Sequence, residues 1–136
     1  MKFIPINHKN IEHLTQFIEN IGASSKFFRY YDKRQASSVI NNHIVTLLLF
    51  DGPSVGYGHL DKEKDKIWLG ICVKEGFEGK GYGKKIMKKL INSYDKDIHL
   101  SVDKDNKKAF HLYKRFSFKK IKESDTMFFM KRTGVE

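Results

Sequence analysis

The first third of the chain alternates between strand-like and helix-like patterns of apolar residues. Lys2–Ile6 alternates weakly, which predicts a short edge strand in which Pro5 is tolerated. The next segment predicts a helix that begins at Asn7 or His8 and ends at Gly22, because apolar residues recur there at spacings of three and four (Ile11, Leu14, Phe17, Ile18 and Ile21). A loop and a second, short helix from about Asp32 are expected to follow.

Three strands with turn signals between them come next. Ile44–Phe50 is a strand-length apolar run, and the sequence Asp51–Ser54 is typical of a turn. Val55–Asp61 and Lys66–Val73 follow, and the charged residues 62–65 separate them. We therefore expect the three strands to pair as antiparallel hairpins.

The second half alternates helices with strands. A glycine-rich stretch leads into a helix with one apolar face (Ile86, Met87, Leu90 and Ile91), Asp97–Val102 predicts a strand, and residues 105–116 predict a cationic helix. Residues 118–122 and 126–131 predict two closing strands. The order β-α-α-β-β-β-α-β-α-β-β describes an α/β (α+β) fold. Its mixed central sheet of six to seven strands should contain a right-handed β-α-β crossover.

Length and composition fit one domain over residues 1–136. The chain is 40% hydrophobic and contains eleven phenylalanines, enough for a single core. No apolar run approaches the roughly 20 residues of a membrane helix, and no signal-peptide pattern is present. Cys72 is the single cysteine, which excludes an internal disulfide. A cytoplasmic protein without a membrane partner or a metal is expected.

The net charge of +10 is the unusual property of the composition, with 26 Lys and Arg against 16 Asp and Glu. Such an excess attracts anions, although solvated surface lysines explain it equally well. The lysines are dense in residues 80–89 and 104–122, around the glycine-rich stretch. A nucleic-acid-binding protein would need a contiguous basic face, so the sequence favours a phosphorylated small molecule and no nucleic acid.

The glycine-rich stretch carries the most specific chemistry. Glycines between a strand and a helix let several N–H groups point into one concavity, and the helix start adds free amides, which together suit a pyrophosphate. A flexible turn is the alternative. Tyr82 stands where an NTPase loop needs Lys, and Lys84 stands where a dinucleotide fingerprint needs glycine. The pattern [Q/R]-x-x-G-x-[G/A] fits residues 78–83 except at Glu78.

This loop and a second motif together resemble the GCN5-related N-acetyltransferase (GNAT) superfamily over about residues 44–118. The second motif, V-x-x-x-N-x-x-A-x-x-L-Y-x-x-x-G-F, matches at Val102, Asn106, Ala109, Leu112, Tyr113 and Phe118. Glu78 replaces the usual Arg or Gln, and Ser117 replaces a glycine. The resemblance implies a single GNAT-like domain that transfers an acetyl group from acetyl-CoA to an amine.

The resemblance also implies the residues that bind acetyl-CoA. The pyrophosphate would lie on Glu78, Gly79, Lys80, Gly81, Tyr82, Gly83 and Lys84, and the pantetheine arm on Ile71, Cys72, Val73, Asn106 and Ala109. The Val73 N–H would bind the thioester oxygen. The Tyr113 hydroxyl would protonate the departing thiolate, whereas a core role is the alternative for this tyrosine. The Cys72 side chain is expected to fill the core.

The general base and the acceptor are less determined. Lys66–Val73 contains no acid, so His59 is the expected base, with Asp61, His99, His111 or an ordered water as alternatives. Phe28, Arg29, Tyr30 and Arg34 are expected to hold the acceptor unless they only pack between helices. With the charge of +10, they favour an anionic acceptor such as an amino sugar or a nucleotide-linked amino sugar.

Other functions remain open from the sequence. A protein or peptide N-acetyltransferase is the alternative within the enzyme class, and a non-catalytic CoA-binding module is the alternative outside it. A homodimer is among the assemblies that the sequence allows.

Overall fold

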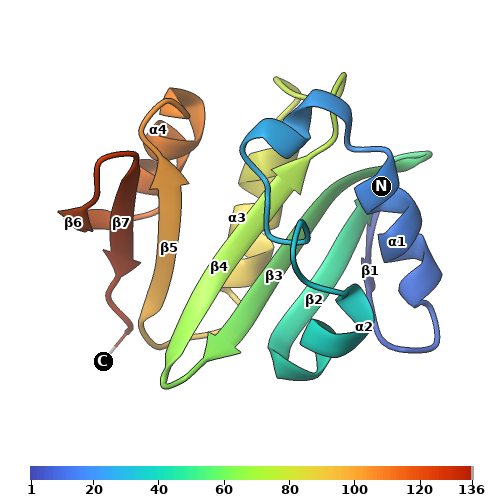
Figure 1. Cartoon of the computed structure of the whole chain (residues 1–136), viewed down its shortest axis with the longest axis horizontal. Helices are drawn as coiled ribbons and strands as arrows, with labels where there is room; N and C mark the ends of the chain where they lie inside the picture. Colours follow the sequence, from blue (N-terminus) through green and yellow to red (C-terminus); the bar gives the residue numbers. More distant parts are fainter. Residues whose placement is uncertain (136) are drawn as a thin grey trace.

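A seven-stranded mixed sheet forms the centre of the protein, as the computed structural model shows over residues 1–135 (Figure 1). The strand order is β1-β2-β3-β4-β5-β7-β6, and all pairs are antiparallel except β4 with β5. The strands are β1 (Lys2–Pro5), β2 (His43–Phe50), β3 (Ser54–Glu63), β4 (Lys66–Val73), β5 (Ile98–Asp103), β6 (Lys119–Glu123) and β7 (Met127–Arg132). The predicted fold class and the predicted order of helices and strands along the chain are confirmed.

Helices cover both faces of the sheet and create two apolar cores. The helices α3 (Tyr82–Ile91) and α4 (Lys107–Arg115) lie on one face, over a core that includes Leu60, Ile86 and Leu100. On the other face lie α1 (Ile11–Glu19), α2 (Ala36–Val39) and the 3-10 helices η1 (Gly22–Lys26) and η2 (Ile40–Asn42), over Leu14, Phe17 and Leu48. Within residues 1–135, every helix is too short or too polar to cross a bilayer.

The amino-terminal helices differ from their predicted limits. The first helix begins at Ile11, because residues 7–10 form a turn in which the Asn10 side chain accepts a hydrogen bond from the Asn7 N–H at 2.8 Å. It ends at Glu19, and Gly22, with φ of +65°, starts η1 instead of ending α1. The short helix expected from Asp32 begins at Ala36. The residues between η1 and α2 are therefore an irregular segment.

Strands β4 and β5 separate along their length. Their one registered pair joins Trp68 to His99, near the start of both strands. Beyond that pair the strands diverge toward their carboxyl ends, where the segments leading to α3 and α4 begin (Figure 1). The sheet thus has an opening between its two halves, bordered by the amino-terminal ends of two helices.

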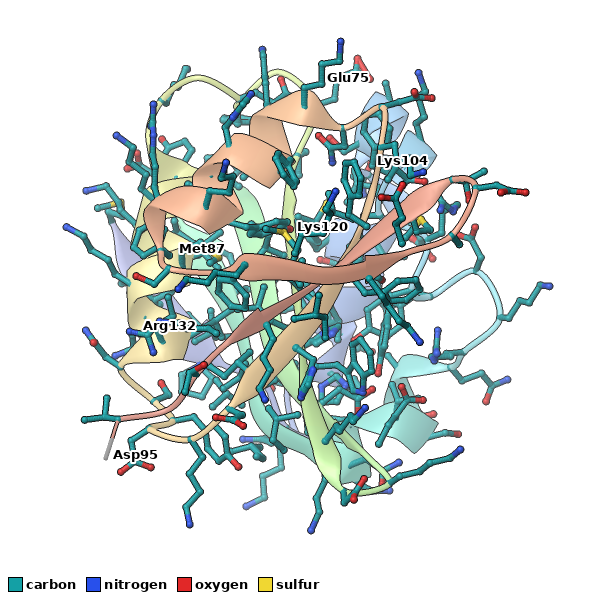
Figure 2. The ribbon with its side chains drawn as sticks, turned by 90° about the vertical axis from the view of Figure 1, so that its left-hand side faces the viewer. Glu75, Met87, Asp95, Lys104, Lys120 and Arg132 are labelled. Carbon is teal, nitrogen blue, oxygen red and sulfur yellow. The ribbon has the colours of Figure 1, made fainter. Side chains whose placement is uncertain are left out.

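The outer hairpin of the sheet carries much of the positive charge. Strands β6 and β7 cross in front of β5 in Figure 2, and all five residues of β6 are exposed. Lys104 and Lys120 both pair with Glu123, at 2.5 and 3.3 Å. The lysines of β6 consequently lie on a solvated surface.

The carboxyl end of α4 has a Schellman motif with an unusual residue. The Phe118 N–H donates to the Tyr113 carbonyl and the Ser117 N–H to the Lys114 carbonyl, both at 3.1 Å. Ser117 has φ of +70°, a conformation that glycine adopts without a steric penalty. Serine in place of the family's glycine therefore makes this chain reversal less relaxed.

Replacing Ser117 with glycine should stabilise the protein by about 1 kcal/mol, because the left-handed conformation costs a side chain roughly that much. Denaturant unfolding measures the change. Ser38→Gly is the matched control in α2, where an exposed serine has ordinary helical neighbours and the substitution should lower stability. A loss of stability in Ser117→Gly would contradict the strain assigned to this residue.

Candidate active site

A cavity of about 730 Å³ occupies the opening between β4 and β5. Nearly all of the residues predicted from the sequence line it: His59, Ile71, Cys72, Val73, Glu78, Gly79, Gly81, Tyr82, Gly83, Asn106, Ala109 and Tyr113, together with Phe28, Arg29, Tyr30 and Arg34. The exceptions are Lys80 and Lys84, whose exposed side chains lie outside the lining. One space therefore joins the glycine-rich loop to the aromatic segment before α2.

The glycine-rich loop presents main-chain N–H groups to this cavity. Gly79 and Gly81 have φ of +78° and +85°, and Gly81 is the N-cap of α3 without a side-chain hydrogen bond. The amides of the first turn of α3 are free by the geometry of any helix start, and the helix dipole makes this end positive. An anion such as a phosphate fits this loop.

Two side chains of the loop have structural contacts. The Glu78 carboxylate accepts hydrogen bonds from the Gly76 N–H at 3.1 Å and the Ser24 hydroxyl at 3.4 Å, so it turns back toward its own loop and η1. The Tyr82 hydroxyl donates to Asp51 at 2.5 Å and anchors α3 to the β2–β3 turn. This arrangement explains how the loop accommodates a carboxylate where the family pattern has Arg or Gln.

The open edge of β4 carries main-chain N–H groups that β3 leaves unpaired. The Lys74 N–H donates to the Val55 carbonyl at 2.9 Å, so the alternation of an antiparallel pair turns the N–H groups of Val73 and Ile71 away from β3. They face the opening, where β5 pairs with β4 only at Trp68 in the described chain. An extended ligand can bind this edge as an added strand would.

Tyr113 lies inside the cavity on α4. Its side chain is 7% exposed, and within residues 1–135 its hydroxyl makes no hydrogen bond. Burial, and then the nearby Cys72 thiol, raise its pKa above the ordinary value, so the hydroxyl keeps its proton. Burial also raises the pKa of Cys72 to about 12, which keeps this thiol unreactive.

Asn106 and Tyr113 are seven residues apart, a spacing that predicts one shared helix face, and both line the cavity. Asn106 is the N-cap of α4, and its side-chain oxygen accepts a hydrogen bond from the Ala109 N–H at 3.4 Å.

His59 lies on the opposite side of the cavity, in a row of polar residues along β3. The side chain is 2% exposed, and its Nδ1 is 2.7 Å from the Tyr57 hydroxyl. Its ring occupies the space beside Gly70, where a Cβ would come within 2.5 Å of Nε2. Burial, followed by His43 and Arg34, lowers the His59 pKa well below the ordinary value, so the imidazole is neutral.

Asp61 follows two positions along the same strand face and is 3% exposed. One carboxylate oxygen accepts a hydrogen bond from the Tyr30 hydroxyl at 2.7 Å, and that hydroxyl is also 2.8 Å from His43 Nε2. No Lys or Arg within residues 1–135 forms an ion pair with Asp61. A buried carboxylate that borders a cavity in this way attracts a cationic ligand.

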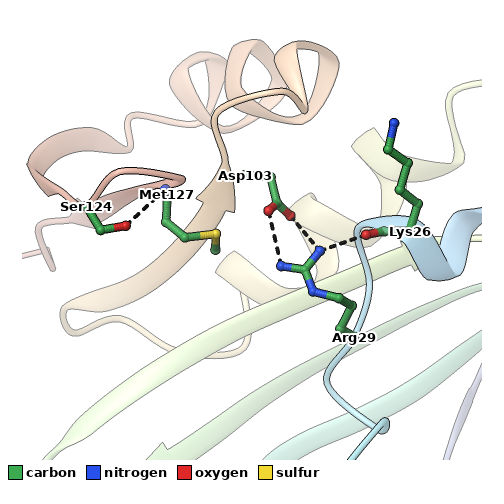
Figure 3. Close-up of polar contacts among 5 residues, drawn as sticks. All are labelled: Lys26, Arg29, Asp103, Ser124 and Met127. Carbon is green, nitrogen blue, oxygen red and sulfur yellow. Dashed lines mark hydrogen bonds and ion pairs between the residues drawn. The ribbon is translucent and has the colours of Figure 1, made fainter.

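The two arginines expected to hold an acceptor already face carboxylates. Arg29 makes two 3.1 Å hydrogen bonds to Asp103 and a third, of 2.7 Å, to the Lys26 carbonyl (Figure 3). Because Asp103 ends β5, this pair crosses the opening of the sheet. The Arg34 guanidinium lies 4.4 Å from the centre of the Tyr30 ring and 3.8 Å from Glu63. Their positive charge is thus largely offset.

Sequence reasoning missed several residues of the lining, among them Glu63, Trp68 and Asp103. Trp68 lies directly opposite Asp61 in the β3–β4 register. Side chains alternate between the two faces of a strand, so Tyr57, His59 and Asp61 share one face of β3. This alternation could have predicted the row of polar residues along β3 from the sequence. His99 and His111, the alternative bases, do not line the cavity.

Comparisons with known proteins agree with the fold. A model described as the acetyltransferase (GNAT) family matches residues 10–118. A spermine/spermidine N(1)-acetyltransferase of Bacillus subtilis (strain 168) is 33% identical over 52% of this chain and 56% of that protein. The chain therefore spans about half the length of the curated relatives it matches.

Two solved structures illustrate the similarity in fold. The GNAT domain of S. lividans PAT has a TM-score of 0.80 at 15% identity, covering 96% of this chain and 89% of that one. A phosphinothricin acetyltransferase from Sinorhizobium meliloti in complex with AcCoA has a TM-score of 0.76 at 13% identity, covering 98% and 88%. At these identities the two structures establish the fold alone.

The buried, neutral His59 should make stability depend on pH. Its pKa is lower in the folded than in the unfolded chain, so its contribution is complete above about pH 6.5 and is lost as the pH falls below that value. Between pH 7.5 and 5.5 the loss due to His59 should be about 1.4 kcal/mol. Denaturant unfolding of the wild type and of His59→Gln at both pH values measures this loss, as the difference between the two proteins in how much stability they lose.

His111→Gln is the control, because this histidine is exposed on α4. The free energy of unfolding of His111→Gln should change with pH as that of the wild type does. That of His59→Gln should fall less as the pH is lowered. The same decline in all three proteins would contradict a neutral, buried His59.

Proposed function

The chain belongs to the acetyltransferase (GNAT) family, and we propose on this basis that it transfers an acetyl group from acetyl-CoA to a primary amine of a small cationic molecule of the polyamine type. The buried Asp61 carboxylate is the observation on which the proposal of a cationic acceptor rests. The relative named a spermine/spermidine N(1)-acetyltransferase supports the same class of amine.

The cavity supplies the groups that acetyl-CoA requires. The amides from Gly79 to Lys84 would hold its pyrophosphate at the start of α3. Lys80 and Lys84 would add positive charge from outside the cavity, and the open edge of β4 at Ile71 and Val73 would bind the pantetheine arm. Acetyl-CoA supplies the activated acetyl group.

Three groups of the chain surround the place where the transfer would occur. The Val73 N–H would stabilise the negative charge that develops on the carbonyl oxygen. Tyr113, protonated because its pKa is raised, would give its proton to the departing sulfur. His59, neutral because its pKa is lowered, would accept a proton from the amine through Nε2.

The acceptor would lie along the polar face of β3. His59 and Asp61 are two strand positions apart, which corresponds to about 7 Å. An extended diamine can span this distance, with its reacting nitrogen at His59 and its second ammonium at Asp61. Tyr30 and Trp68 border the same space. Their aromatic rings can bind a cation and pack against the methylene chain of a diamine.

An anionic amino sugar is the second candidate, because Arg29 and Arg34 line the cavity and are partly exposed, at 47% and 39% of their side chains. They could turn from Asp103 and Glu63 toward a phosphate. The cationic acceptor is preferred because Asp61 has no such alternative partner.

A thiol-release assay with acetyl-CoA tests the proposal across diamines, polyamines, amino sugars, nucleotide-linked amino sugars and peptides. Diamines and polyamines should give the fastest turnover. Asp61→Asn should raise their KM roughly 10- to 100-fold, the effect of losing a charge-assisted contact, and leave the Kd for acetyl-CoA unchanged. Asp65→Asn, in the exposed β3–β4 turn, is the control. Release with peptides alone, or with no amine, would contradict the proposal.

Gly81→Val should weaken acetyl-CoA binding roughly tenfold or more by calorimetry, because valine does not adopt a φ of +85° and would displace the amides that follow. Gly52→Val is the matched control, since Gly52 also has a positive φ and open space but lies in the β2–β3 turn, outside the cavity lining. Both variants should lose similar stability. Equal affinity in the two would exclude the loop as the pyrophosphate site.

Tyr113→Phe should lower kcat by about 100- to 10,000-fold, the range of general acid catalysis. The ring packing stays, so the melting temperature should change little, and acetyl-CoA affinity should fall by no more than about 1 kcal/mol. A variant that keeps more than roughly a third of the wild-type kcat would exclude the acid role, provided chemistry limits the rate.

A further inference from the structure

The proposed reaction leaves one proton without a destination. An acceptor ammonium carries three protons on nitrogen, and the amide product keeps one of them. A second ends on the sulfur of the released thiol, the step assigned to Tyr113. The third must reach solvent, although His59, the group that would take it, is 2% exposed.

Aromatic side chains separate His59 from solvent. The Tyr30 ring lies 4.3 Å from the His59 ring, centre to centre, and the His43 ring lies 4.7 Å away. Tyr57 is completely buried below them. Once an acceptor fills the cavity, direct access of water to His59 is closed from these sides.

A chain of short hydrogen bonds leads away from His59. Its Nδ1 is 2.7 Å from the Tyr57 hydroxyl, and that hydroxyl is 2.5 Å from the hydroxyl of Tyr31. Tyr31 belongs to the irregular segment before α2 and is only partly buried. The chain therefore connects a buried imidazole with a residue that reaches the surface.

We propose that Tyr57 and Tyr31 relay to solvent the proton that His59 removes from the acceptor ammonium, an inference that rests on the proposed function. In the active polarity, His59 Nδ1–H donates to Tyr57, Tyr57 O–H donates to Tyr31, and Nε2 is free to accept. As Nε2 takes the ammonium proton, each donor passes its proton one step outward, and Tyr31 releases one to water. His59 is left neutral.

The position of His59 depends on the residue opposite it. Gly70 faces His59 across the β3–β4 pair and leaves the room that the imidazole fills. The ring is thus held between Gly70 and Tyr30, with one nitrogen toward Tyr57 and the other edge toward the cavity. Gly70 is a positioning residue for the relay.

Other titratable and charged groups face this chain and must be considered in any pH profile. They are His43 from β2, Asp61 from β3, Cys72 from β4, and Tyr30 and Arg34 from the segment before α2. A comparison of two acceptors at a single pH avoids their titration. That comparison is the basis of the following experiment.

The experiment uses 1,3-diaminopropane and its 2,2-difluoro analogue, whose fluorines lower the amine pKa so that a neutral reacting amine is abundant at pH 8. A neutral amine has only one proton to lose, and the sulfur takes it, so the relay is not needed. Tyr57→Phe should lower kcat/KM at least about tenfold for 1,3-diaminopropane and less than about twofold for the analogue. Tyr31→Phe, partly buried and less prone to destabilise the fold, should give the same split.

Tyr94→Phe is the control, because Tyr94 lies beyond α3 and outside the cavity lining, and it should match the wild type on both diamines. Equal losses on the two diamines in Tyr57→Phe and Tyr31→Phe, or no loss in either variant, would overturn the relay while leaving the acetyltransferase intact. A wild type that acetylates neither diamine would overturn the proposed acceptor class and the relay with it.

Discussion

The single backbone pairing between β4 and β5 is the constraint on which the site depends. Because the two parallel strands, in the described residues, meet only at Trp68 and His99, the N–H groups of Ile71 and Val73 remain available on an inner strand of the sheet. A fully paired sheet would have used them in its own ladder. The same separation brings the starts of α3 and α4 to the edges of one opening, which the Arg29–Asp103 ion pair crosses.

The opening also connects two chemically different faces. On the side of α3 and α4, glycines, main-chain amides and Tyr113 suit a phosphorylated thioester. On the side of α1 and α2, His59, Asp61 and aromatic rings suit a basic amine. In the proposed reaction, the two reactants would therefore approach from opposite faces and meet between the strands.

Short-range patterns in the sequence predicted the local geometry of the first of these faces. The spacing of Gly79, Gly81 and Gly83 before a helix, and of Tyr113 within one, depends on local geometry that a few neighbouring residues determine. Arg29 illustrates the limit, since its partner Asp103 is 74 residues away and no local pattern indicates the pair. Asn106 shows a second limit: its spacing from Tyr113 is helical, yet it caps the helix, because caps and interior positions follow different rules.

The buried Asp61 carboxylate has a consequence for folding itself. Without a cation beside it, the folded protein has lost the hydration of a charged group and gained only the hydrogen bond from Tyr30. Replacing a buried charge of this kind with a neutral residue is often neutral or stabilising. If Asp61 binds the acceptor as proposed, some stability of the free protein is exchanged for recognition of its ligand.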